Sequence, residues 1–116
     1  SLDMRLSSQC WNQLEADAQV LDYIPYRAVT IFGRKARAHR TIYEPLPEWE
    51  ALIREPLVER VAAAGYKYVY MDAAWWDSLS IESRQSFSQG CVREVDRREQ
   101  SSGKDFRILY DVGNCR

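Results

Sequence analysis

The residues best suited to chemistry in this sequence are few, and the first of them is its single histidine, His39. A histidine in a loop can act as a general base or contact a phosphate group. His39 has neither a second histidine nor a nearby cysteine to work with, which is typical of a solvated loop residue. We therefore expect no residue of this chain to be catalytic, to bind a cofactor or to ligate a metal.

Four permanent positive charges surround His39 in residues 33–40. Such a group of cations can hold a phosphate or an anionic headgroup through charge-assisted hydrogen bonds. The alternative, which we favour, is an exposed loop whose charge is offset by the acids that follow it, Glu44, Glu48 and Glu50. The loop is nevertheless a candidate ligand or partner surface, with the cations Arg34, Lys35, Arg37 and Arg40.

Asp72 directly follows the stretch with the strongest strand character in the chain. Ligands bind at the carboxyl ends of strands in open α/β sheets, so Asp72 is a candidate ligand contact. No glycine-rich phosphate loop precedes a helix, however, and a nucleotide site has little support. We favour Asp72 as a helix cap or a salt-bridge partner.

Two adjacent tryptophans, Trp75 and Trp76, follow Asp72. Successive side chains of one helix or strand cannot point the same way, so we expect one ring in the core and the other partly exposed. An exposed indole would be a candidate partner surface or membrane-proximal surface, and ordinary packing is the alternative.

Two of the three cysteines, Cys91 and Cys115, flank a predicted hairpin whose loop centres on residues 101–102. They therefore enter and leave at the same open end, where the geometry permits a disulfide. Such a bond would indicate an oxidising compartment, and two buried free thiols are the alternative. The third, Cys10, has no assigned role, and no Cys-x-x-Cys spacing supports a zinc site or a redox motif.

Composition limits the class of protein further. A length of 116 residues favours one domain, and 46% apolar with 28% charged residues excludes a disordered or low-complexity chain. The formal net charge of -1 disfavours general binding to nucleic acid or anionic lipid. Nucleic-acid binding would rest only on the 33–40 loop and an exposed aromatic residue. The longest apolar stretch, residues 61–66, is far shorter than the roughly 20 residues of a membrane span.

Local patterns predict a single compact α/β domain, with a mixed sheet, flanking helices and a C-terminal antiparallel hairpin. A polar Ser7-Ser8 pair can cap the first helix, Pro56 separates two helices, and Gly65 provides a left-handed stop. Helices are expected at residues 7–16, 47–55, 56–64, 73–79 (helical or irregular) and 80–88, the last closed by Gly90. Strands are expected at 18–24, 27–32, 66–71, 91–98 and 105–112, in the overall order α-β-β-α-α-β-α-β-β.

Several of these segments carry a family resemblance: residues 27–34, 45–52, 64–72 with Trp75 and Trp76, 91–93, and 106–112 with Cys115 and Arg116. Together they resemble the soluble C-terminal domain of uncharacterised bacterial multi-spanning membrane proteins. Those proteins are similar to protein O-mannosyltransferase-like glycosyltransferases that use lipid-linked sugars. The resemblance implies that the catalytic carboxylates belong to the membrane portion, which precedes this domain. It also implies an extracytoplasmic module, as the proposed disulfide does.

We therefore expect residues 1–116 to be one soluble domain excised from a longer membrane protein, with a Ser-Leu start typical of vector residues. The expected function is a non-catalytic accessory domain on the extracytoplasmic face of the bacterial membrane, with a cytoplasmic location as the alternative. Its expected partner is the membrane portion of its own parent chain, without nucleic-acid binding or direct membrane insertion. The alternative function is a small ligand-binding or enzymatic domain that uses Asp72, His39 and the 34–40 loop.

Overall fold

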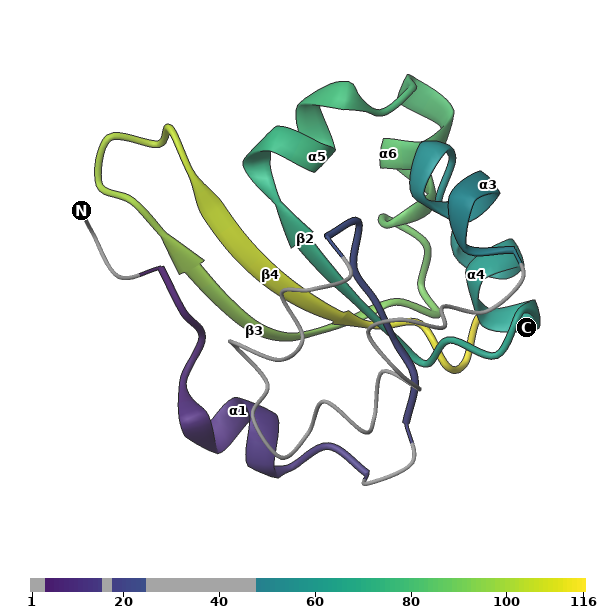
Figure 1. Ribbon diagram of the computed structural model, residues 1–116, viewed down its shortest axis with the longest axis horizontal. Helices are drawn as coiled ribbons and strands as arrows, with labels where there is room; N and C mark the ends of the chain where they lie inside the picture. The colour runs from purple at the N-terminus through teal and green to yellow at the C-terminus, as the bar shows by residue number, and fades with distance from the viewer. Residues whose placement is uncertain (1–3, 16–17, 25–47) are drawn as a thin grey trace.

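A four-stranded mixed sheet organises the chain (Figure 1). The computed structural model describes residues 4–15, 18–24 and 48–116. Its strands are β1 (Val20–Leu21), β2 (Tyr68–Asp72), β3 (Arg93–Glu99) and β4 (Phe106–Asp111), in the spatial order β1-β2-β4-β3. Its helices are α1 (Ser8–Asn12), α3 (Trp49–Arg54), α4 (Val58–Ala63), α5 (Ala73–Ser78) and α6 (Ile81–Ser86). The predicted α/β class is confirmed.

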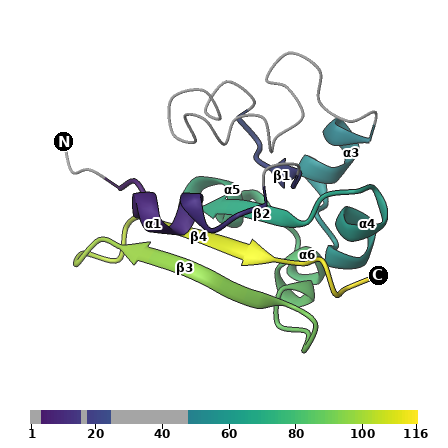
Figure 2. The same ribbon diagram turned by 90° about the horizontal axis from the view of Figure 1, so that it is seen from below.

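Strand directions also match the predicted mixed sheet. β1 runs parallel to β2, with Val20 opposite Tyr68, and β2 runs antiparallel to β4, with Tyr70 opposite Leu109. β4 and β3 form the predicted antiparallel hairpin, whose register shifts at Val95 because one extra residue is inserted in β3. Figure 2 shows β3 at the outer edge of the sheet.

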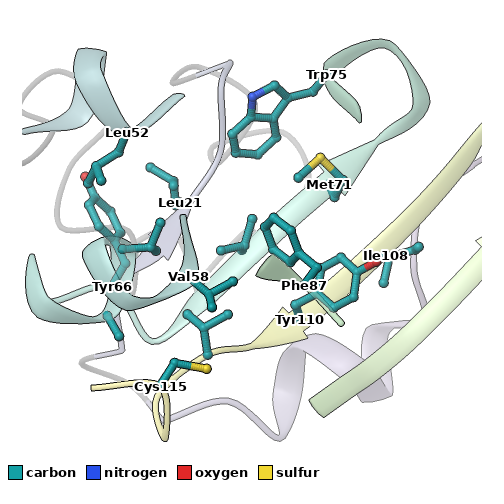
Figure 3. Packing of buried hydrophobic residues seen from close by; sticks show 14 of the residues in the cluster. Leu21, Leu52, Val58, Tyr66, Met71, Trp75, Phe87, Ile108, Tyr110 and Cys115 are labelled. Atoms are coloured by element: carbon teal, nitrogen blue, oxygen red, sulfur yellow. The ribbon is translucent and has the colours of Figure 1, made fainter. Parts of the chain in front are cut away.

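The two faces of the sheet are covered by different parts of the chain (Figure 1). Helices α3 to α6 pack on one face, which we call the helix face, and α1 lies on the other, which we call the arm face. Figure 3 shows the helix-face core, where side chains from the helices meet those of β2 and β4. The labelled residues there are Leu21, Leu52, Val58, Tyr66, Met71, Trp75, Phe87, Ile108, Tyr110 and Cys115.

Helix ends follow the capping signals in the sequence, although the elements are shorter than predicted. Ser7 caps α1 through the Cys10 N–H, and Ser80 caps α6 through the Ser83 N–H. Gly65, at a φ of 103°, follows α4 as predicted. Gly90 does not end α6, because this helix stops at Ser86 and Phe87 is its C-cap residue.

Three other predictions need correction or lie outside the described residues. Two helices, α5 and α6, stand between β2 and β3: the segment expected at 73–79 as helical or irregular is the helix α5, which the predicted order leaves out. β2 begins at Tyr68 rather than at residue 66, since the Tyr66 N–H still donates to the Val61 carbonyl of α4. The strand predicted at 27–32 and the loop at 33–40 lie outside the described residues.

The middle of β4 is buried on both faces of the sheet, whereas β3 is mostly exposed. Ile108 and Tyr110 point into the helix-face core, and Leu109, between them in sequence, is fully buried on the arm face. The physical reason is the N-terminal segment, whose side chains cover Leu109 from the second side. The sequence of the hairpin alone cannot indicate that the N-terminal segment covers Leu109.

Candidate functional site

Asp72 lies where the sequence places it, at the carboxyl end of β2, and it caps α5. Its Oδ1 accepts the Trp75 backbone N–H at 2.8 Å, and its Oδ2 accepts the Tyr23 hydroxyl at 3.1 Å. The residue is only 4% exposed. The predicted capping role is thus present: one carboxylate oxygen caps α5, and the other accepts the Tyr23 hydroxyl.

A second buried acid, Asp22, follows the parallel neighbour strand β1 and was not identified from the sequence. Its Oδ1 accepts the Ile24 N–H at 3.0 Å, and its carbonyl accepts the Trp49 indole N–H at 3.0 Å. Asp22 and Asp72 therefore both lie at the carboxyl edge of the parallel strand pair, which is the edge where α/β sheets bind ligands. The hydrogen bonds described here use these acids to hold turns and a helix start.

The two adjacent tryptophans divide as predicted. Trp75 is 2% exposed, stacks on Tyr23 with ring centroids 5.3 Å apart, and donates its indole N–H to the Ile53 carbonyl at 2.7 Å. Trp76 is partly exposed and lies 6.0 Å from the Phe87 ring and 6.5 Å from the Phe106 ring. Trp75 is therefore a core residue, and of this pair only Trp76 has surface that a partner could contact.

The other members of the predicted ligand or partner surface fall outside the described residues. They are Arg34, Lys35, Arg37, His39 and Arg40. Their proximity to Asp72 therefore stays a prediction.

The disulfide between Cys91 and Cys115 is present, as the hairpin geometry permits. The two Cα atoms are 5.0 Å apart, and the bond spans 24 residues of sequence. Cys91 follows α6, and Cys115 follows β4 and is buried in the helix-face core. The bond thus ties the two ends of the hairpin to each other.

A polar cluster that the sequence analysis missed joins Glu15 to the start of β2. One carboxylate oxygen of Glu15 accepts the Lys67 ammonium at 2.5 Å, and the other accepts the Tyr68 hydroxyl at 2.7 Å. These hydrogen bonds lower the pKa of Glu15 from 4.5 to about 2. Burial and the Glu15 hydrogen bond raise the pKa of Tyr68. Glu15 is distant in sequence from both partners, so no local motif could reveal the cluster.

A second polar cluster lies beside the free thiol of Cys10. Cys10 is buried, and burial, followed by the charge and hydrogen bond of Asp96, raises the pKa of its thiol to about 12. Asp96 also accepts the Ser7 hydroxyl at 3.4 Å. Because the thiolate is the nucleophilic form, Cys10 is inert at neutral pH while this environment is intact.

A polar hollow of about 330 Å3 lies at the end of the sheet where Lys67 and Asp111 face Asn114 and Arg116. Two of its charges are already engaged, since Lys67 pairs with Glu15 and Asp111 pairs with Arg93 at 3.1 Å. Among residues 4–15, 18–24 and 48–116, no group of three or more His, Cys, Asp or Glu could hold a metal ion. No helix in the part of the chain described here is long and apolar enough to cross a membrane.

The chain matches none of the protein-family models, curated proteins or solved structures to which it was compared. The site geometry therefore has to be interpreted by itself. In the described residues, Asp72 caps α5, Arg93 pairs with Asp111 across two strands, and Glu15 fastens the N-terminal segment.

Proposed function

We propose that this chain is a non-catalytic accessory domain on the extracytoplasmic face of a bacterial membrane protein that is similar to lipid-linked-sugar glycosyltransferases. The observation that supports this most is the disulfide between Cys91 and Cys115. Structural disulfides persist in oxidising compartments and are rare in the cytosol. The family resemblance of the sequence points to the same side of the membrane.

The uses of the polar side chains fit an accessory role. Asp72 spends both carboxylate oxygens on the Trp75 N–H and the Tyr23 hydroxyl, and Glu15 spends both on Lys67 and Tyr68. Side chains engaged in this way hold a fixed shape rather than meet a substrate. The partner we propose is the membrane portion of the parent chain, and Trp76 is the described residue best suited to contact it.

The location is tested in the natural gene product that contains this chain, in intact cells. A single cysteine introduced by Ser101→Cys, in the exposed loop of the hairpin, should react with a membrane-impermeant maleimide before lysis. The matched thiol-trapping experiment should find Cys91 and Cys115 oxidised, a difference of about 2 daltons from the reduced form by mass. Labelling of Ser101→Cys only after lysis, with both native cysteines alkylated, would place the domain in the cytoplasm and overturn the proposal.

The accessory role is tested separately by point variants of the same gene product. His39→Ala and Asp72→Asn should leave its glycosyl-transfer rate within about twofold, because neither residue would touch the reacting atoms. Asparagine keeps an oxygen that can cap α5, so the second variant also keeps the fold. A loss of 100-fold or more in either variant, with normal expression, would instead support the alternative of an enzymatic or ligand-binding site at the carboxyl edge of the sheet.

A further inference from the structure

The N-terminal arm, which we define as residues 4–15, contacts the sheet through side chains. Its apolar members Leu6, Cys10, Trp11 and Leu14 are buried on the arm face. They pack against Val20, Tyr68, Tyr70 and Leu109. The arm's backbone hydrogen bonds are local, as in the bond from Trp11 N–H to the Ser7 carbonyl, and none joins the arm to a strand within the described residues.

Polar contacts fasten the arm at three points along its length. Near its start, Arg98 donates to the Arg5 carbonyl at 3.0 Å. In its middle, Asp96 accepts the Ser7 hydroxyl. At its end, Glu15 binds Lys67 and Tyr68. The Lys67 and Glu15 side chains are 38% and 49% exposed, so water competes for this last contact.

The helix face is secured in a different way. β2 and β4 share a five-residue antiparallel ladder, and the Cys91–Cys115 disulfide joins the two ends of the hairpin within the helix-face core. Segments with few backbone bonds to the rest of a protein, and with water-exposed polar contacts, open at lower free energy than the core. We therefore expect the N-terminal arm to open before the helix face does.

We propose that the N-terminal arm is a strap that detaches from the sheet as one unit while the sheet, helices α3 to α6 and the disulfide stay folded. Glu15 is its latch, because its bonds to Lys67 and Tyr68 are shorter than the contacts of Arg5 and Ser7 described above. Detachment uncovers an apolar strip of the arm face, formed by Val20, Tyr70 and Leu109. It also uncovers Cys10, which the docked arm keeps buried.

Cys10 provides the measurement, since it is the free thiol of a chain whose other two cysteines are bonded. The protein with its disulfide intact is alkylated in low concentrations of urea, and the modified fraction is measured by mass. Global unfolding is followed in parallel by far-ultraviolet circular dichroism. We expect the alkylation rate to depend on urea much more weakly than global unfolding does, because opening the arm exposes little surface.

Matched variants test the latch. Glu15→Gln should label about fivefold faster than the wild type, as expected for loss of one half-exposed ion pair. Tyr68→Phe, which removes the hydroxyl that Glu15 accepts, should change the rate in the same direction. The control Glu50→Gln removes an exposed glutamate of α3 that pairs with Arg54, and it should leave the rate unchanged.

Two results would overturn the proposal. One is an alkylation rate with the same urea dependence as global unfolding at every concentration, which would mean that the arm and the core open together. The other is a Glu15→Gln rate equal to those of the wild type and Glu50→Gln. Because these measurements use only the isolated domain, they stand whether or not the domain belongs to a membrane protein.

Discussion

The two faces of this sheet show two ways to cover a strand. In the described residues, the helix face is covered by helices α3 to α6, and a disulfide joins the ends of the hairpin within its core. The arm face is covered by a short segment that carries a five-residue helix and is fastened by side chains. Burial is similar in the two places, since Leu109 and Val69 are both fully buried. Burial alone therefore does not measure how firmly a layer is attached to the sheet.

Truncation of a helix-face core residue should have the largest effect. Ile108→Ala removes a 3% exposed side chain from the centre of β4 and leaves a cavity that the helices cannot fill. We expect the free energy of unfolding to fall by about 3–4 kcal/mol. Urea denaturation monitored by circular dichroism measures this change. A loss below about 1 kcal/mol would show that this face is loosely packed too.

Removal of the disulfide should have the next largest effect. The double variant Cys91→Ala with Cys115→Ala increases the conformational entropy of the unfolded chain across a 24-residue span. The free energy of unfolding should therefore fall by about 3 kcal/mol. The same urea titration measures it. Cys10 alkylation at low urea should stay as in the wild type, because the bond does not touch the arm. Faster alkylation would contradict the independence of the two faces.

Truncation of an arm residue should cost less than its burial indicates. Leu14→Ala deletes a 3% exposed side chain, yet the loss is limited to the free energy with which the arm docks. We expect about 1–2 kcal/mol in global stability, roughly half the effect of Ile108→Ala. Cys10 alkylation should accelerate tenfold or more. A global cost equal to that of Ile108→Ala would mean that the two faces unfold as one.

Acid should weaken the arm by the smallest amount. The pKa of Glu15 is lowered from 4.5 to about 2 in the folded protein, so its contribution is complete above pH 4.5 and is lost as the pH falls towards 2. Because the pair is half exposed, this contribution is about 1 kcal/mol or less. The difference in unfolding free energy between the wild type and Glu15→Gln should therefore shrink across this interval. A constant difference would remove the ionised carboxylate as the cause.

Sequence reasoning succeeded where the decisive forces are local. Gly65 ends α4 because a left-handed residue is needed there, and Ser80 begins α6 because its hydroxyl meets the Ser83 N–H. The pairing of Cys91 with Cys115 follows from the shape of one hairpin. Each of these features depends on residues that are close in sequence or joined by a single turn.

Features that depend on distant parts of the chain could not be predicted in this way. Glu15 meets Lys67 and Tyr68 across more than 50 residues of sequence, and nothing in the local pattern of either segment reports the contact. Asp22 is fully buried although aspartate usually lies at the surface; its Oδ1 accepts the nearby Ile24 N–H, and its backbone carbonyl accepts the indole N–H of the distant Trp49. Only the folded chain brings Trp49 to Asp22.

The outer strand β3 has a consequence for how copies of this protein behave towards each other. Six of its seven residues are charged, Val95 adds a bulge, and Arg97 pairs with both Glu94 and Glu99 on one face. A flat, apolar edge would invite the edge strand of another molecule to continue the sheet. Here an approaching strand would meet a bent backbone and would have to strip water from side chains of both signs. The β3 edge of this sheet is thus protected against pairing with a strand of another molecule.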